Sequence, residues 1–250
     1  MKDITFFVIL LLGDNMQILA SDFDNTIYYA HDEEKTRQNI AAIKDFISQG
    51  NIFCIITGRN YTSLKKTLNE YNIPYTYLIC EDGAKAFDSV DNCISTTYLE
   101  EDEIKEIEKL LKRIDADYYL DDGYNKTEYH KDCVKIVVNC VDELEKNIMV
   151  HTIKDQINVH IYASRRHVNI IHRTVNKAKA LEDLCKNENL DINLLHVAGD
   201  DFNDYEMLAS YDGAVMKEHN RKLDHLKKEE YDNLSDYIEV LIKRNKLMKK

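Results

Sequence analysis

The most informative stretch of the chain is Gln17–Thr26, QILASDFDNT, in which a short apolar run leads directly into two aspartates. The run Gln17–Ser21 has the length and composition of a buried β-strand, and Asp22 follows where that strand would end. In open sheets of parallel strands, ligands bind at the carboxyl ends of the strands. The stretch therefore predicts a strand that delivers Asp22 and Asp24 to a site at the edge of a sheet.

Short apolar runs and amphipathic helical patterns alternate on both sides of the chain's middle third. A helix is expected around Ile40–Ile47, where apolar residues share one face before Gly50. Further strands are expected at 52–56, 77–80, 194–198 and 214–216, and further helices at 61–71, 177–187, 204–210 and 234–241. This order predicts an α/β fold with a doubly wound, Rossmann-like parallel sheet. The basic residues 243–250 are expected to be frayed.

The middle of the chain has a different pattern, helix–strand–strand repeated twice. The helices are expected at 100–114 and 143–153, and the alternating strands at 117–120, 134–138, 159–163 and 167–171. Alternation of apolar and polar residues is typical of a sheet with one face in water. We therefore predict an inserted α+β (αββαββ) domain at 84–170, with the two parts of the core domain at 16–83 and 171–250.

Residues 1–15 form an N-terminal extension of uncertain status. The apolar run Phe6–Leu12 is too short to cross a bilayer, which needs about 20 apolar residues. The core pattern begins at Met16, so the extension is interpreted as an artefact of the assigned start or as an extra strand or helix. A signal peptide is a third alternative, although no clear basic segment or cleavage site accompanies the run.

The composition limits the classes of partner. The 250 residues carry a net charge of −12, and nucleic acid is therefore not expected as a partner, because it requires a basic face. No membrane association is expected, and a small molecule is the expected partner. None of the six cysteines forms a CxxC pair, so reduced thiols in a cytoplasmic protein are expected. The oligomeric state cannot be read from the sequence.

Polar groups follow other predicted strands as well. Thr57-Gly58-Arg59 comes after the second strand, Gly199–Asp204 (GDDFND) comes after a later one, and Lys177 begins the helix before it. Carboxylates gathered at one edge repel one another unless a cation joins them. Oxygen ligands suit a hard ion such as Mg²⁺, and the lack of His or Cys in these segments disfavours zinc.

These segments together resemble the haloacid dehalogenase superfamily of phosphohydrolases, in its Cof-type branch with a large inserted cap. DFDNT is similar to the first motif of that family, DxDxT, and TGR at 57–59 is similar to the second. Asn176-Lys177 followed by Ala180-Leu181 resembles the third motif, and GDDFNDYEML at 199–208 resembles the fourth. Each motif alone is a modest signal, whereas all four in order over nearly the whole chain are specific.

The resemblance implies catalytic roles for Asp22, Asp24, Thr57 and Lys177, and a substrate-binding role for Gly58. Asp22 would be the nucleophile that forms an aspartyl-phosphate, and Asp24 would be the general acid and base. Thr57 and Gly58 would bind the phosphoryl oxygens. Lys177 would bind the substrate's phosphoryl group and neutralise charge, although Lys179 competes with it two positions later.

The resemblance also implies a Mg²⁺ site. Asp22, Asp24 through its backbone carbonyl, and Asp200 would hold the ion, with Asp204 beside them and Asn203 orienting the substrate side. The expected reaction is hydrolysis of small phosphate monoesters, such as sugar phosphates or phosphorylated cofactors. Two alternatives stay open: a phosphomutase on the same scaffold, and a non-catalytic phosphoacceptor or binding module. Asn25 departs from the family pattern, in which glycine is usual at this position.

Overall fold

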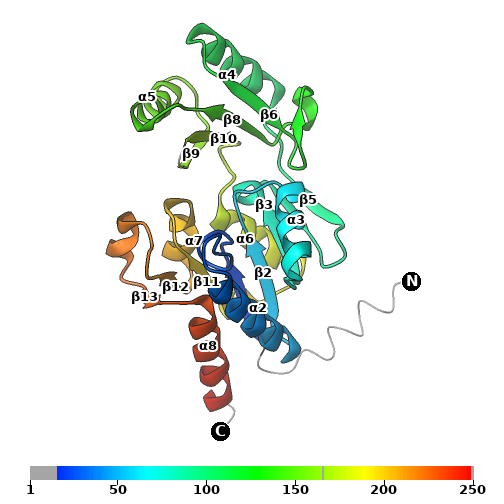
Figure 1. The fold of residues 1–250 in the computed structure, drawn as a ribbon. Coiled ribbons are helices and arrows are strands. Elements are labelled where there is room, and N and C mark those ends of the chain that lie inside the picture. Colours follow the sequence, from blue (N-terminus) through cyan, green and yellow to red (C-terminus); the bar gives the residue numbers. More distant parts are fainter. Residues whose placement is uncertain (1–15, 165, 249–250) are drawn as a thin grey trace, which may run out of the picture. The chain divides into compact units, whose positions relative to one another are not determined.

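A computed structural model describes residues 16–164 and 166–248 of the chain (Figure 1). The predicted N-terminal extension, residues 1–15, lies outside the described residues. The chain divides into two compact units. The first contains residues 16–56, 72–78 and 181–248, and the second contains residues 57–71 and 79–180. The predicted domain limits remain a prediction.

An eight-stranded sheet has the strand order β13-β12-β11-β1-β2-β3-β4-β5. Strand β1 lies between β11 and β2 and runs parallel to both, with Ser21 opposite Ala198 on one side and Ile55 on the other. The bounds are β1 Ile18–Ser21, β2 Ile52–Ile56, β3 Tyr77–Cys80, β4 Lys85–Phe87, β5 Cys93–Thr96, β11 Leu195–Gly199, β12 Asp212–Met216 and β13 Glu229–Tyr231. The predicted parallel α/β sheet is confirmed. Strands β4 and β5, an antiparallel pair, were not expected.

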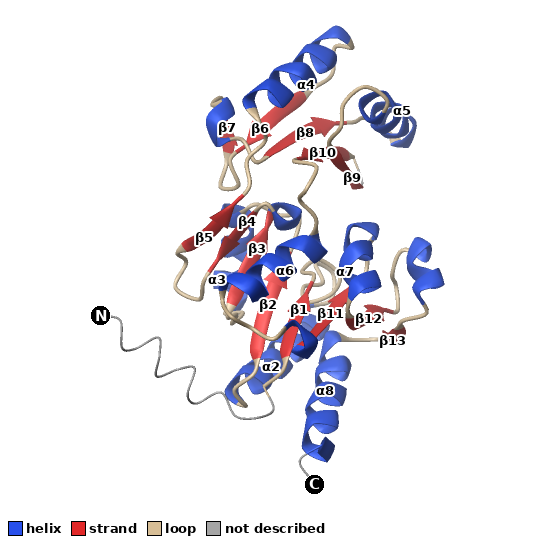
Figure 2. Ribbon diagram, turned by 180° about the vertical axis from the view of Figure 1, so that it is seen from behind, coloured by secondary structure: helices blue, strands red, loops and turns tan. Residues whose placement is uncertain are grey.

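The first unit is built around β1, whose four residues are all buried. Helix α2 (Glu33–Ser48) begins after Asp32, whose side chain accepts a hydrogen bond from the Lys35 backbone N–H, and it buries Ile40, Ile43 and Phe46. Helix α8 (Leu234–Met248) lies beside α2 (Figures 1 and 2). Residues 181–187 of helix α6 (Lys177–Asn187) and helix α7 (Tyr205–Ser210) also belong to this unit, whereas the first turn of α6 belongs to the second.

The expectation that residues 243–250 are frayed was wrong as far as Met248, where helix α8 ends. Asn245 is buried, and the Arg244 guanidinium donates to the Glu229 carboxylate at 3.0 Å. These contacts hold the basic end of the helix on the fold, and residues 249–250 lie outside the described part.

The second unit contains an antiparallel sheet with the strand order β7-β6-β8-β10-β9. Helices α4 (Glu101–Arg113) and α5 (Glu143–Lys154) cover one face of it, and Ile107, Ile136 and Ile170 belong to the core that they share with the sheet (Figure 2). The remaining bounds are α3 Tyr61–Tyr71, β6 Tyr118–Asp121, β7 Lys126–Thr127, β8 Lys135–Asn139, β9 His160–Ser164 and β10 His167–Ile171. The predicted helix–strand–strand repeat is confirmed, with β7 as a short addition.

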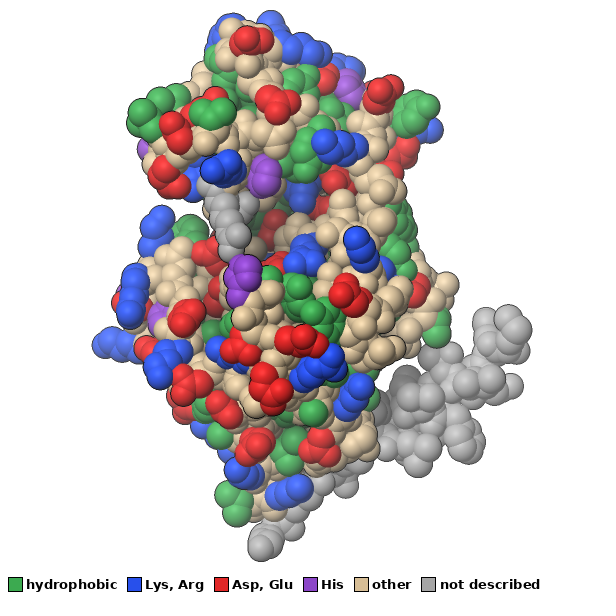
Figure 3. Space-filling model, in the orientation of Figure 1, with side chains coloured by type: hydrophobic (Ala, Val, Ile, Leu, Met, Phe, Trp, Pro, Cys, Tyr) green, Lys and Arg blue, Asp and Glu red, His purple; other side chains and the backbone are tan. Residues whose placement is uncertain are grey.

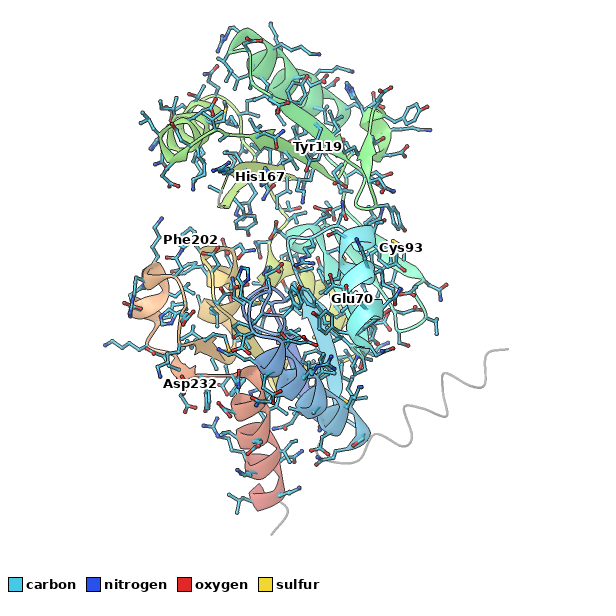
Figure 4. All side chains as sticks on the ribbon, viewed as in Figure 1. Glu70, Cys93, Tyr119, His167, Phe202 and Asp232 are labelled. Carbon is cyan, nitrogen blue, oxygen red and sulfur yellow. The ribbon has the colours of Figure 1, made fainter. Side chains whose placement is uncertain are left out.

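The described surface carries mixed charge. On the face drawn in Figure 3, Lys and Arg side chains are interspersed with Asp and Glu side chains. All six cysteines are free thiols, and only Cys93, labelled in Figure 4, is exposed. Among residues 16–164 and 166–248, no helix combines the length and apolarity needed to cross a bilayer.

Candidate active site

Asp22 is fixed by the sheet itself. Its backbone N–H donates to the Ala198 carbonyl at 2.9 Å, which extends the pairing of β1 and β11 by one residue. The Ser21 hydroxyl donates to the Asp22 carbonyl at 2.8 Å. Asp22 is buried, so its carboxylate is held at the carboxyl end of β1 and away from bulk water.

A tight loop follows Asp22. The backbone N–H groups of Ile27 and Tyr28 both donate to the Phe23 carbonyl, and the Asn25 N–H donates to the Tyr28 carbonyl at 2.8 Å. Asn25 has a φ of 58°, in the left-handed region that asparagine tolerates better than most residues. The departure from the family's glycine therefore preserves the turn. Asp24, just before it, is half-buried.

The loop after β11 is organised by Asp204. Its Oδ2 atom accepts hydrogen bonds from the backbone N–H groups of Asp200 at 2.9 Å and Asp201 at 3.0 Å. The Asp201 carboxylate accepts from the side-chain amide of Asn220 at 2.8 Å. Phe202 is 46% exposed at the start of the following short helical turn (Figure 4). The loop is thus held from inside by Asp204, which is fully buried.

A direct hydrogen bond joins the two loops. Thr26 Oγ1 donates to Asp200 Oδ1 at 3.1 Å, across 174 positions of sequence. The side-chain amide of Asn39 donates to the Thr26 carbonyl at 3.1 Å, and the Asn39 oxygen accepts from the Ser235 N–H at 2.9 Å. Neither Thr26 nor Asn39 had a role predicted from the sequence. The only local signal for Thr26 was its place as the last residue of DFDNT.

The three carboxylates of Asp22, Asp200 and Asp204 come together in the first unit. Each offers an oxygen, these oxygens lie within 4.8 Å of one another, and all three residues are buried. Buried like charges at this spacing repel strongly unless a cation neutralises them. A set of carboxylate oxygens suits a hard divalent cation, so the residues present fit Mg²⁺. The Asp24 carboxylate is not one of this group.

The family model for haloacid dehalogenase-like hydrolases matches residues 19–131 and 116–233. The chain belongs to this family. A Buchnera aphidicola protein provisionally named as a phosphatase is 27% identical to the hydrolase, over 76% of this chain and 82% of its own.

Solved structures show the same fold. The phosphatase BT1666 of Bacteroides thetaiotaomicron has a TM-score of 0.77 at 16% identity, covering 92% of this chain and 95% of its own. The subclass IIB sugar phosphatase BT4131 has a TM-score of 0.70 at 16% identity, covering 94% and 98%. At this level of identity the likeness concerns the fold alone.

Tyr29 is a further residue that the sequence analysis did not identify. Its hydroxyl is buried and has no hydrogen-bond partner among the described residues of the hydrolase. Burial, and then the negative charge of Asp200, raise the pKa of the Tyr29 hydroxyl far above its ordinary value. The neutral hydroxyl is therefore a potential donor in the surroundings of the acidic group.

Thr57, Gly58 and Lys177 belong to the second unit of the hydrolase. The Thr57 N–H donates to the Ile79 carbonyl at 2.9 Å, and Thr57 Oγ1 accepts from the Arg59 N–H at 3.2 Å. Lys177 is fully buried at the start of α6, whereas Lys179 is exposed, which favours Lys177 over its competitor. The roles assigned to these three residues and to the half-buried Asn203 remain predictions.

Proposed function

We propose that this hydrolase is a Mg²⁺-dependent phosphatase that acts on small phosphate monoesters, such as sugar phosphates or phosphorylated cofactors. The observation that carries the proposal is the gathering of the buried Asp22, Asp200 and Asp204 carboxylates. Two phosphatases with the same fold, one named as a sugar phosphatase, support the substrate class. The physiological substrate would be a phosphorylated metabolite of the cytoplasm.

The chemistry begins with Asp22. One oxygen of its carboxylate attacks phosphorus, the bond from phosphorus to the ester oxygen breaks, and Asp24 gives its proton to that leaving oxygen. Water then attacks the aspartyl-phosphate, Asp24 takes a proton from the water, and inorganic phosphate leaves with the Asp22 carboxylate restored. Bound Mg²⁺ would offset the repulsion between the carboxylate and the phosphate dianion, and Asp22, Asp200 and Asp204 would hold it.

In the second unit, Thr57 and Gly58 would bind the phosphoryl oxygens, and Lys177 would supply positive charge. Lys177 keeps its ammonium group out of solvent, which suits a short-range partner with a full negative charge. Asn203, between the buried Asp204 and the exposed Phe202, would orient the substrate side of the site.

The test uses the purified full chain and p-nitrophenyl phosphate, followed by a panel of phosphorylated metabolites. We expect turnover with Mg²⁺, loss of turnover with EDTA, and a fall in kcat of at least about 1,000-fold in Asp22→Asn. Asp45→Asn, a change at an exposed aspartate of α2, is the matched control and should keep full activity.

The same assay separates the alternatives. A phosphomutase would convert one sugar phosphate into an isomer without steady release of phosphate. A phosphoacceptor module would accept at most one phosphoryl group per chain and would show no turnover. Full activity in Asp22→Asn would refute the proposed nucleophile.

A further inference from the structure

Three consecutive carbonyls of the Thr57-Gly58-Arg59 loop are all held by donors of the second unit. The Thr57 carbonyl accepts from the Asp82 N–H at 2.9 Å, and the Arg59 carbonyl accepts from the Glu81 N–H at 3.1 Å. The Gly58 carbonyl between them accepts from Lys135 Nζ at 3.0 Å. The two outer donors are backbone groups of a neighbouring turn, whereas the middle donor is a side chain from strand β8.

The Gly58–Arg59 peptide connects Lys135 to the Thr57 hydroxyl. A trans peptide is planar, so its carbonyl and its N–H point in opposite directions and move together. Lys135 binds the carbonyl of this peptide, and the N–H of the same peptide donates to Thr57 Oγ1 at 3.2 Å. Because the Thr57 oxygen accepts this bond, its hydroxyl proton can be directed toward another acceptor.

Lys135 is an unusual choice for a buried position. Its side chain is 7% exposed and forms an ion pair with Glu81, whose side chain is 0% exposed. No hydrogen-bond donor reaches either Glu81 oxygen among the described residues apart from this close ion-pair contact. Apolar residues in place of a buried ion pair are often as stable or more stable, so stability alone does not account for a lysine here.

The turn that contains Glu81 and Asp82 has a strained backbone, and it donates hydrogen bonds to the Thr57-Gly58-Arg59 loop. Glu81 and Asp82 have φ angles of 56° and 55°, which cost free energy for residues other than glycine. This conformation aims both of their N–H groups at the loop carbonyls. The Asp82 carboxylate also lies so close to Gly58 that a methyl group there would be 2.9 Å from Asp82 Oδ1. The surroundings therefore determine the loop's conformation tightly.

We propose that Lys135 is a positioning residue of this enzyme. From strand β8 it fixes the Gly58–Arg59 peptide, and through that peptide it orients the Thr57 hydroxyl for the phosphoryl group. The proposal rests on the proposed function, in which Thr57 binds the phosphoryl oxygens. In this proposal, the Lys135 side chain of strand β8 acts directly on the loop that carries Thr57.

The first experiment separates positioning from ion pairing. Lys135→Met alone leaves Glu81 buried without its partner and is expected to lower Tm. The double variant Glu81→Gln/Lys135→Met removes both charges and should recover Tm to within about 3 °C of the wild type. Its kcat toward p-nitrophenyl phosphate should nevertheless stay about 10- to 100-fold below that of Glu81→Gln, with KM changed less than about threefold. Recovery of kcat together with Tm would overturn the proposal.

Lys85 offers a matched control. It is also a buried lysine of the second unit that donates to a backbone carbonyl, that of Asp122 at 2.7 Å, but this carbonyl is outside the loop. Lys85→Met should leave kcat within about twofold of the wild type when corrected for the folded fraction. An equal loss of kcat in Lys85→Met would show that any buried lysine of this unit has the same effect, and the specific role of Lys135 would be refuted.

Two further measurements test whether Lys135 acts through the Thr57 hydroxyl and whether it fixes the Gly58–Arg59 peptide. Thr57→Val has no hydroxyl to orient. Adding Glu81→Gln and Lys135→Met to this variant should therefore lower kcat less than about twofold relative to Thr57→Val alone. Amide hydrogen exchange of Arg59 should be about tenfold faster in the double variant than in Glu81→Gln, whatever the chain hydrolyses. If the wild type turned over no phosphate ester, the proposed function would fail while this exchange rate still tested the positioning. Unchanged exchange at Arg59 would refute the positioning itself.

Discussion

The carboxylate of Asp204 lies directly against the α-carbon of Gly199. A methyl group at position 199 would be 2.5 Å from Asp204 Cγ and 2.5 Å from its Oδ2, closer than such atoms approach in proteins. Glycine is required here for space, because it lets one buried carboxylate cross the end of β11 and accept the N–H groups of Asp200 and Asp201. The absence of a side chain at Gly199 therefore allows Asp204 to occupy its position in the acidic group.

Gly199→Ala should lower both stability and activity, because Asp204 must move. We expect a loss of about 2–4 kcal/mol in the free energy of unfolding and at least about a tenfold loss of kcat at saturating Mg²⁺. Gly50→Ala is the contrasting variant: Gly50 has a φ of 84°, but nothing lies within 4 Å of the methyl group that alanine would add there. It should cost about 1 kcal/mol in urea unfolding and leave kcat unchanged. Normal kcat in Gly199→Ala would contradict this account of Asp204.

Thr26 should matter through its hydroxyl rather than its size. Thr26→Val removes the donor to Asp200 Oδ1, and we expect about a 10- to 100-fold weaker affinity for Mg²⁺ by isothermal titration calorimetry. Thr26→Ser keeps the hydroxyl and should bind Mg²⁺ within about threefold of the wild type. Equal affinities for the two variants would show that the hydrogen bond does not orient Asp200.

The acidic group should make stability depend on a divalent cation. Without metal, the buried carboxylates within 4.8 Å of one another repel, so Asp200→Asn should raise Tm measured in EDTA above that of the wild type. Mg²⁺ at about 100 times its Kd should stabilise the wild type by about 2.7 kcal/mol and Asp200→Asn by far less. Differential scanning fluorimetry in EDTA and in a Mg²⁺ series measures both effects, and an equal Mg²⁺ response in the two proteins would argue against a site at these residues.

The strands that could be predicted from the sequence are those whose own residues form a clear local pattern. Apolar runs with clear boundaries, such as Ile52–Ile56 and Tyr77–Cys80, match β2 and β3 at both ends. Strands β5 and β13 consist largely of exposed or half-buried residues and owe their conformation to pairing partners elsewhere in the chain, so no local pattern marked them.

The candidate site likewise contains residues that could be placed from the sequence and contacts that could not. The acidic residues follow predicted strands, and this order along the chain is enough to place them at one sheet edge. The hydrogen bond from Thr26 to Asp200 joins residues 174 positions apart, and the one from Lys135 to Gly58 joins residues 77 positions apart. In neither case does the sequence around the donor indicate which residue accepts the hydrogen bond. Such supporting contacts depend on tertiary packing, which a single sequence does not reveal.

Glu81 should make stability depend on pH near neutrality. Burial raises the pKa of its carboxyl from 4.5 to about 7, against the opposing effect of Lys135, while the negative charges of Asp121 and Asp82 raise it further. Between these two values the folded chain holds a proton that the unfolded chain has released. The stability due to this proton is therefore fully present below pH 4.5 and is lost as the pH rises through about 7.

Glu81→Gln removes this titration. From pH 5 to pH 8, the wild type should lose up to about 3 kcal/mol more than Glu81→Gln in the free energy of unfolding, measured with urea at each pH. Glu106→Gln, a change at an exposed position of α4, should follow the wild-type curve. A constant difference between wild type and Glu81→Gln across this range would mean that Lys135 keeps the Glu81 carboxyl ionised throughout, which contradicts a carboxyl that titrates near neutrality.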